Sequence, residues 1–305
     1  MRTFTLKGLF VTAIFMLLGC LAIHAADGDL ITKQITIKLE EAGTLASRIA
    51  DTKKYKITNL KIMGEINGTD LSFIREMAGR DNTGWGTEGK LTTLDLSEAK
   101  IVKGGLNYYY YNNCFFHTSD DVIGDYAFSG CSRLTSLTIP SSVTEIDESA
   151  FEGCSGLTSL TIPSSVTWIG RSAFKGCSRL TSLTLPSSVT WISESAFDGC
   201  SGLTSIYVSW ESPLSIDAST FKDVNTEKCI LYVPEGTYDD YWLSNWGIFA
   251  NIVEYDATGI NHIMTSGDAK EISRYAADGQ RLEVPAKGLN IVKYSDGCVK
   301  KVVVQ

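Results

Sequence analysis

Histidine is scarce in this chain, and recognisable catalytic motifs are missing from it. Of 3 histidines, His24 lies in the N-terminal leader described below, which leaves His117 and His262 as imidazole bases. Cys114 lies near His117, but a nucleophile and base also need a group that orients the base. No His-Glu-x-x-His, paired Cys-x-x-Cys or glycine-rich phosphate loop occurs, and the acidic pair at 120–121 lacks further spaced calcium ligands. We therefore expect no catalysis, cofactor or metal site.

The chain also lacks an excess of positive charge and any long apolar run beyond its N-terminus. Its 27 basic and 35 acidic residues give a net charge of −8. That balance argues against binding nucleic acid or anionic lipid electrostatically. Arg2 and Lys7 precede the apolar run 9–23, which ends in small residues and is too short to span a bilayer. Residues 1–25 therefore predict a signal peptide, and the protein is expected outside the cell or on its surface or outer membrane.

One phrase occurs four times between residues 123 and 214. The copies begin at Ile123, Ile146, Ile169 and Ile192, 23 residues apart, and the first reads IGDYAFSGCSRLTSLTIPSSVTE. A fixed period in this range predicts a solenoid, in which each unit completes its apolar core against its neighbours. We expect an α/β solenoid of 23-residue units, with a surface for binding rather than a cleft for chemistry.

Residue type and spacing predict which side chains of a unit face inward. Seven positions are expected to be buried in the second unit and its predecessor: Leu134, Leu137, Ile139, Val143, Ile146, Ala150 and Phe151. Ala150 and Phe151 are assigned to a helical turn opposite a short strand. Pro140 ends that strand, because proline cannot donate to the ladder.

One cysteine recurs at the same position of every unit: Cys131, Cys154, Cys177 and Cys200. Cysteines of an exported protein usually form disulfides. In a stack, however, equivalent side chains run parallel instead of facing one another, which is poor geometry for a bridge. We expect buried free thiols, which behave as small hydrophobic groups.

Less regular segments flank the repeats. Residues 30–122 read as capping repeats, with helices at 43–50 and from Thr69 or Asp70 to Met77, and strands at 57–62 and 91–96. Residues 123–256 complete the solenoid, with a last strand at 229–234 and an aromatic-rich helical cap at 238–249. Residues 257–305 alternate as strands of a small antiparallel module.

Aromatic side chains mark the places where the repeat pattern breaks. The interruption 101–122 is expected to be a loop, either packed as a cover or presented as a contact patch. Outward-facing Ser and Thr residues follow the strands, as solvated surface or as ligands for a glycan or peptide. Trp168 and Trp191 share one repeat position and could form a carbohydrate platform or protect an edge. The candidate ligand contacts are Tyr108, Tyr109, Tyr110, Tyr111, Trp168, Trp191, Tyr207 and Trp210.

The unit IxxxAFxGCSxLTSLTIPSSVT resembles the BspA-like leucine-rich repeat family of bacterial surface proteins. That resemblance implies a curved leucine-rich repeat solenoid and, for some members, adhesion to host matrix proteins or other bacteria. The tail motifs Asp-Gly-Gln-Arg at 278–281 and Lys-Lys-Val-Val-Val at 300–304 are similar to a C-terminal sorting domain of Bacteroidetes, which implies surface anchoring. Residues 17–20 resemble a bacterial lipoprotein signal, which implies lipidation of Cys20; cleavage near Ala25 is the alternative.

We therefore expect a non-enzymatic, adhesin-like protein, exported to the surface or secreted. Its partner would be a host or bacterial surface protein or a glycan, and a lipid anchor would come from Cys20. The alternative is a structural protein of the cell envelope without an external ligand.

Overall fold

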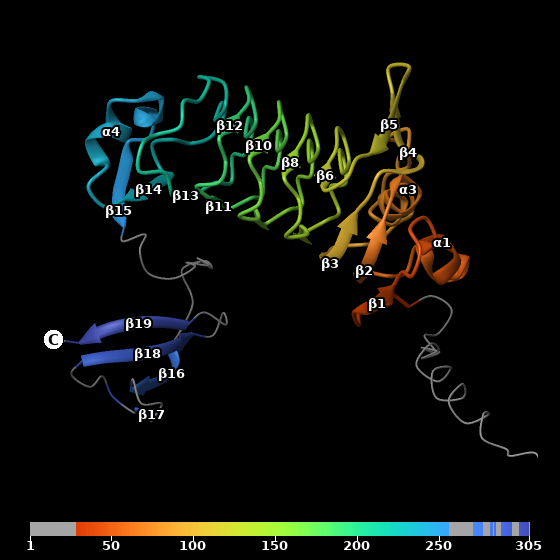
Figure 1. Cartoon of the computed structure of the whole chain (residues 1–305), viewed down its shortest axis with the longest axis horizontal. Helices are drawn as coiled ribbons and strands as arrows, with labels where there is room; N and C mark the ends of the chain where they lie inside the picture. Colours follow the sequence, from red (N-terminus) through yellow and green to blue (C-terminus); the bar gives the residue numbers. More distant parts are fainter. Residues whose placement is uncertain are drawn as a thin grey trace, which may run out of the picture.

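The structure is a computed structural model that describes residues 29–255, 271–276, 281–282, 284, 288–294 and 299–304 (Figure 1). The predicted signal peptide 1–25 and its Cys20 lie outside the described residues. Among the residues described, no helix has the length and apolar character needed to cross a membrane.

The chain from Ile35 to Ile101 forms the first coils of the stack. Its elements are β1 (Ile35–Lys38), α1 (Leu45–Arg48), α2 (Asp51–Lys54), β2 (Asn59–Ile66), α3 (Gly68–Met77) and β3 (Thr93–Ile101). The helix expected at 43–50 is one turn long. Asn67, not Thr69 or Asp70, caps α3: its side chain accepts from the Thr69 N–H, and the Asp70 carboxylate accepts from the Asn67 N–H.

Residues 104–118 form a hairpin, where the sequence suggested a loop. Strand β4 (Gly104–Tyr111) pairs antiparallel with β5 (Cys114–Thr118). Asn112 and Asn113 both have positive φ, 50° and 63°, as a two-residue turn between twisted strands requires. Asparagine tolerates this conformation better than most residues, so Asn112 and Asn113 favour the turn of the hairpin. The tyrosines around them hid this signal in the sequence.

Two parallel sheets run along the stack on different sides (Figure 1). The larger has the order β1-β2-β3-β7-β9-β11-β13-β14-β15, and its later strands are β7 (Ser136–Thr138), β9 (Ser159–Thr161), β11 (Ser182–Leu185), β13 (Ser205–Val208), β14 (Ile230–Pro234) and β15 (Asn251–Tyr255). The smaller contains β6 (Val122–Ile123), β8 (Glu145–Ile146), β10 (Trp168–Ile169) and β12 (Trp191–Ile192). Equivalent residues pair, as Leu137 does with Leu160 and Ile146 with Ile169, so the solenoid prediction is confirmed.

A ladder of phenylalanines fills the core opposite the larger sheet. The rings of Phe128, Phe151, Phe174, Phe197 and Phe221 stack with centroids 5.1–5.4 Å apart. Their segments are turns and not the expected helical turns, because the N–H of each of the first four phenylalanines bonds to the following coil: Phe151 N–H donates to the Ala173 carbonyl at 2.7 Å. A helix would satisfy those groups within one coil and would remove this link between coils.

The repeat cysteines are buried free thiols, as the sequence predicts. Each of three donates to the carbonyl of a phenylalanine one coil earlier: Cys154 to Phe128, Cys177 to Phe151 and Cys200 to Phe174, at 3.1–3.3 Å. Burial raises the pKa of the Cys154 thiol well above its usual value, so it stays protonated.

The C-terminal cap comprises α4 (Tyr238–Trp242), the 3-10 helix η1 (Asn245–Ile248) and β15. Trp246 is fully buried, and its indole N–H donates to the Leu214 carbonyl at 2.7 Å. Strands β16 (Glu271–Ala276), β17 (Arg281–Leu282), β18 (Gly288–Tyr294) and β19 (Val299–Val304) form a separate antiparallel sheet in the predicted module. The sorting role of this tail stays a prediction.

Truncating one member of the phenylalanine ladder should destabilise the whole stack. Phe151 is fully buried between two rings, so we expect Phe151→Ala to lower the free energy of unfolding by about 3–5 kcal/mol. Denaturant unfolding followed by circular dichroism measures this loss. Ser159→Ala, on the exposed face of β9, is the matched control; a loss below about 1 kcal/mol for Phe151→Ala would contradict the ladder's role.

Thiol reactivity should separate Cys114 from the repeat cysteines. Cys114 is exposed on the hairpin, whereas Cys131, Cys154, Cys177 and Cys200 are buried. A maleimide added to the native protein without reductant should modify Cys114 and spare these four, and denaturant should make all of them reactive. Mass spectrometry of the peptides identifies the labelled sites; repeat cysteines blocked in denaturant would indicate disulfides.

Candidate binding surfaces

Four of the eight candidate contact residues are buried, so their assignment to an exposed contact surface is wrong. Tyr108 and Tyr109 retain 1% and 8% of their exposed area, and Tyr207 and Trp210 retain 5% and 8%. Tyr207 stacks on Tyr232, with ring centroids 4.3 Å apart. The Trp210 indole donates to the Val189 carbonyl at 2.8 Å. Tyr108, Tyr109 and Trp210 belong to the hydrophobic core, whereas Tyr207 is packed against the rings of Tyr232 and Tyr255.

The base of the hairpin is fixed on both of its faces. The Tyr108 hydroxyl donates to the Asp125 carbonyl at 2.8 Å, and burial raises the pKa of this phenol. The Tyr109 ring lies on the Arg75 guanidinium, whose carbon is 4.5 Å from the ring centroid. Because neighbouring residues of a strand point to opposite faces, the two tyrosines hold the hairpin from two sides.

Arg75 joins α3 to the first regular coil, a role that its sequence position does not reveal. The side chain is fully buried and donates to the carbonyls of Tyr126 at 2.8 Å and Ala127 at 3.0 Å. It also donates to the Asp81 carbonyl at 3.3 Å. A guanidinium can satisfy several carbonyls at once because its five donors form a fixed fork. The hairpin therefore packs against a junction that the hydrogen bonds of Arg75 hold in place.

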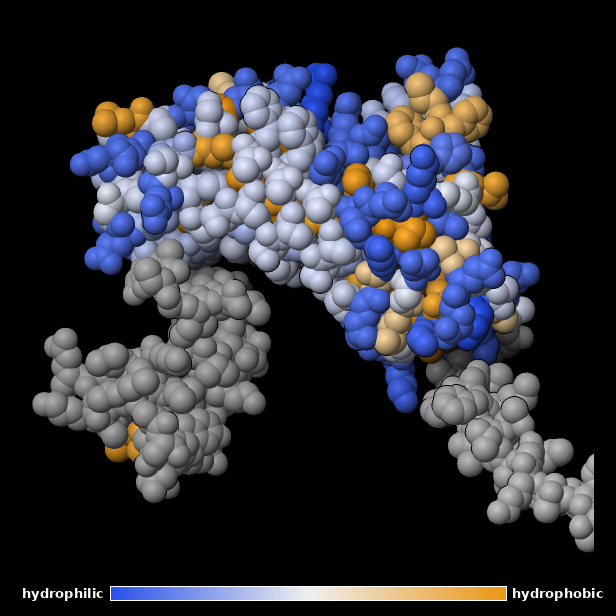
Figure 2. Space-filling view, in the orientation of Figure 1, coloured by the Kyte–Doolittle hydropathy of each residue, from blue (hydrophilic) through white to orange (hydrophobic). Residues whose placement is uncertain are grey.

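The hairpin's outer part presents aromatic side chains to solvent. Phe115 is 64% exposed and Tyr111 54% exposed, and the Tyr110 and Phe115 rings lie 4.8 Å apart. Trp85, which is 76% exposed, belongs to a loop that meets β4 through the bond from Tyr110 N–H to the Asn82 carbonyl. Figure 2 shows apolar residues on the hairpin below a hydrophilic tip. Tyr111 pairs with Cys114 and Phe115 with Tyr110, so these two side chains lie on opposite faces of the hairpin. We call Trp85, Tyr111 and Phe115 together the hairpin patch; Trp85 and Phe115 were not among the predicted contacts.

The two predicted tryptophans form a second exposed group on the smaller sheet. Trp168 and Trp191 are paired residues of β10 and β12, and their rings are nearly parallel, 9° apart, with centroids separated by 5.6 Å. Parallel indoles at that separation overlap face to face, because they are too close to lie side by side in one plane. Each indole therefore covers one face of the other, and the two rings do not form a single flat platform.

The face of the central coils shown in Figure 2 is mostly of intermediate hydropathy. Threonine hydroxyls link successive coils: Thr158 donates to the Thr135 carbonyl at 3.2 Å and Thr181 to the Thr158 carbonyl at 3.2 Å. The outward Ser and Thr of the larger sheet, such as Thr138 and Thr161, are exposed. Their binding role stays a prediction.

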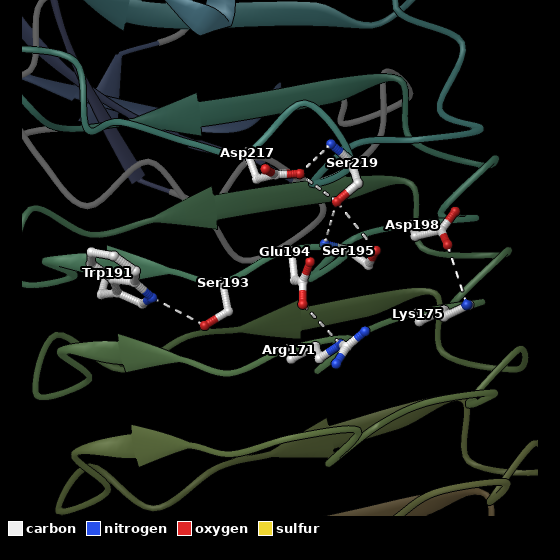
Figure 3. A network of polar contacts seen from close by, with 9 residues as sticks. All are labelled: Arg171, Lys175, Trp191, Ser193, Glu194, Ser195, Asp198, Asp217 and Ser219. Atoms are coloured by element: carbon white, nitrogen blue, oxygen red, sulfur yellow. Dashed lines mark hydrogen bonds and ion pairs between the residues drawn. The ribbon is translucent and has the colours of Figure 1, made fainter.

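Charged residues on the turns form pairs across coils (Figure 3). Arg171 contacts Glu194 at 3.1 Å and Lys175 contacts Asp198 at 3.4 Å. The Ser219 hydroxyl contacts both Asp217, at 2.6 Å, and Ser195. Exposed ion pairs of this kind contribute little to the free energy of unfolding. Their role here is to align one coil with the next. In the described chain no three His, Cys, Asp or Glu side chains form a group that could hold a metal.

Carboxyl groups of two successive coils lie close together at strand β8 of the smaller sheet and in the residues next to it. Burial, followed by the charges of Asp125 and Glu145, raises the pKa of Asp147 to about 6. Burial also raises the pKa of Asp125, although its carboxylate accepts from the Glu148 N–H at 2.9 Å. Such shifts are common at functional sites, but here they follow from stacking acidic residues in successive coils.

The stacked coils and their two parallel sheets define a leucine-rich repeat solenoid. Residues 107–236 match the family model described as the BspA type leucine rich repeat region, in 6 copies. The repeat region therefore belongs to the BspA type of leucine-rich repeats, which confirms the resemblance predicted from its repeated phrase. No curated protein matches the chain.

Three solved structures are similar to the chain over limited lengths. The leucine-rich repeat protein TpLRR of T. pallidum is 36% identical over 29% of this chain and 42% of its own, with a TM-score of 0.29. A leucine-rich repeat protein from Bacteroides ovatus is 19% identical over 50% and 48%, with a TM-score of 0.29. The pneumococcal vaccine antigen PcpA is 16% identical over 73% and 68%, with a TM-score of 0.38. The chain spans less than half of the first two proteins.

The half-buried carboxyl of Asp147 should make stability depend on pH. Its pKa of about 6 lies above the usual value of 3.8, so the native state loses stability as pH rises from about 4 to about 6 and the group ionises. Asp147→Asn should therefore melt at a higher temperature than the parent protein at pH 8, by a few degrees, and show no such gain at pH 4. Scanning calorimetry at both pH values measures the difference. Glu152→Gln, on a neighbouring turn, is the control, and an equal gain at both pH values would contradict the assignment.

Proposed function

We propose that this protein is an exported, non-enzymatic binding protein that engages a protein on another cell or in a host matrix through its hairpin patch. The observation that carries this proposal is the group of exposed aromatic side chains on the two faces of the hairpin that interrupts the solenoid and on the loop that meets it. Trp85, Tyr111 and Phe115 are each more than half exposed. Aromatic residues are enriched at the anchors of protein interfaces, because they bury a large area while few torsions become fixed.

The support beneath the hairpin patch favours binding by a preformed surface. Tyr108 is fixed by its bond to Asp125, and Tyr109 by its contact with Arg75. Since these anchors are buried, the strands that carry Tyr111 and Phe115 need little ordering when a partner binds. Preorganisation of this kind reduces the entropic cost of association.

Export and surface location form part of the proposal. The N-terminal leader at 1–25 and the BspA-type repeats support it, as does the acidic balance of the chain, which is unsuited to nucleic acid. The absence of any catalytic motif in the sequence supports a role without chemistry. Lipidation at Cys20 would retain the protein on a membrane, whereas cleavage near Ala25 would release it.

The experiment compares the full mature chain with two double variants on an array of extracellular matrix and bacterial surface proteins. Tyr111→Ser with Phe115→Ser should weaken binding to a captured partner by about tenfold or more, as expected when aromatic anchors are lost. Tyr238→Ser with Leu243→Ser removes exposed apolar residues from the C-terminal cap and is the matched control. It should bind like the parent protein.

Protease treatment of whole cells tests the location. Cleavage of the repeats in intact cells is expected for a surface protein. Protection from protease, together with no partner on the array, would contradict the proposal and favour the structural role in the envelope. Equal loss of binding in both double variants would show that the hairpin patch is not the contact.

A further inference from the structure

We propose that copies of this chain associate end to end, with the C-terminal end of one stack docked on the N-terminal end of a second copy. These ends carry the two edges of the larger sheet, β15 and β1. Figure 1 shows β1 with α1 at one end of the stack and β15 with α4 at the other. Both surfaces lie apart from the hairpin patch, so this association is independent of the partner proposed for that patch.

The last strand of the larger sheet has backbone groups that point away from the stack. Neighbouring residues of a strand direct their N–H and carbonyl groups to opposite sides. The Tyr255 carbonyl accepts from the Glu235 N–H at 3.1 Å, so Tyr255 and Val253 pair toward β14. Ile252 and Glu254 therefore direct their backbone groups outward. In the described chain no strand or backbone group pairs with them.

The first strand is open in the same way. The Leu39 N–H, at the end of β1, donates to the Met63 carbonyl at 2.9 Å and so points toward the rest of the sheet. By alternation, Thr36 and Lys38 direct their backbone groups outward, and both residues are exposed. Among the residues described, nothing pairs with this edge either. The two caps therefore close the core of the stack but leave its larger sheet unpaired at both edges.

A second copy fits these edges because the larger sheet is parallel throughout. Every strand from β1 to β15 runs in the same direction. A copy shifted along the stack axis brings its β1 beside β15 of the first copy with the two strands parallel. Successive coils within one chain are joined by the same arrangement. Exposed edge strands offer a template for pairing with another chain.

The charges of the two ends favour contact between unlike ends. The first coil, residues 31–58, has six basic and three acidic residues, whereas the last coil, residues 230–255, has four acidic residues and no basic residue. Lys38 and Arg48 are exposed at the first end, and Asp239 and Asp240 at the other. Opposite potentials attract across an interface, and two like ends would repel each other. A head-to-tail contact is therefore preferred to a symmetric one.

The C-terminal end also exposes apolar side chains. Helices α4 and η1 lie between β14 and β15, and the buried Trp246 and Phe249 close the phenylalanine ladder against Phe221, so this segment is the terminal layer. Figure 2 shows apolar residues at this end. Five large side chains there are more than 40% exposed: Tyr238, Trp242, Leu243, Ile248 and Val253. Exposed apolar groups gathered in one region mark interaction surfaces, and the N-terminal end offers the exposed Leu30 and Tyr55.

A contact between unlike ends leaves one free end of each kind on the assembly, so further copies can add. Each added copy presents another hairpin patch. Several patches on one assembly raise the avidity for a surface that carries repeated partners, without any new contact at the patch itself.

The test is sedimentation velocity of the full mature chain over a range of protein concentrations. At low salt we expect the mean sedimentation coefficient to rise with concentration beyond the value of a dimer, and to fall again in about 1 M salt, which screens the end charges. Thr36→Pro should weaken association by about tenfold or more, because it removes a donor that points outward and keeps the pairing of β1 with β2. Thr36→Ser, which keeps the N–H, is the matched control and should associate like the parent protein.

A second variant alters the other end. Trp242→Ser with Ile248→Ser removes exposed apolar groups from the terminal layer and should weaken association by a similar factor. Each variant keeps one intact end, so a mixture of the two should form a dimer of one copy of each that grows no further. Unchanged melting temperatures show that each variant is folded.

The proposal is overturned if the parent protein stays monomeric at every concentration, whatever covers its ends, or if its growth stops at a dimer. It is also overturned if Thr36→Pro associates like the parent protein, or if the two variants do not pair when mixed. Since no external partner is present in this experiment, its failure would leave the hairpin patch as the proposed contact, and a failure at the hairpin patch would leave the end-to-end association untouched.

Discussion

The fold depends on one constraint: each coil must place its polar backbone groups and apolar side chains in register with those of the next coil. The Phe128 N–H donates to the Ala150 carbonyl, and the Phe151 N–H to the Ala173 carbonyl, both at 2.7 Å. The stacked rings and the buried cysteines follow the same register. A single coil could not satisfy these groups, so stability belongs to the stack and not to the unit.

The same constraint explains why the middle of the fold was predictable. An identical side chain every 23 residues can only stack on its own copy, so the period gave the register, the buried positions and the free thiols. Where the repeat loosens, the partners lie far away in sequence. Tyr207 is buried by Tyr232, and Trp210 by its bond to Val189 and its contact with Trp246, which no local pattern indicates. The prediction for Tyr108 and Tyr109 was wrong for another reason: Tyr108 bonds to Asp125 and Tyr109 packs on Arg75 at the base of a hairpin, and the sequence alone does not show that the hairpin exists.

A stack also creates a problem at each end, since its terminal coils have no neighbour. At the N-terminal side, α3 and Arg75 cover the first regular coil, with the guanidinium donating to carbonyls of Tyr126 and Ala127. At the C-terminal side, the buried Trp246 and Phe249 close the ladder against Phe221. Both caps use buried contacts that the regular units do not repeat. Capping therefore accounts for much of the irregular sequence without any functional role, and burial is the criterion that separates capping residues from contact residues.

The exposed aromatic residues that capping does not explain include those at two discontinuities of the stack. The hairpin enters between β3 and β7, where the chain leaves the larger sheet, and β12 is the point at which the smaller sheet stops while the larger one continues. Uniform coils offer every ligand the same hydroxyl-covered surface, and identical neighbouring sites cannot distinguish one position along the stack from another. An exposed aromatic group at a discontinuity is different. It occurs at one position along the stack only, and the regular coils next to it hold it in place. The regular coils thus supply rigidity, and selectivity arises where their regularity ends.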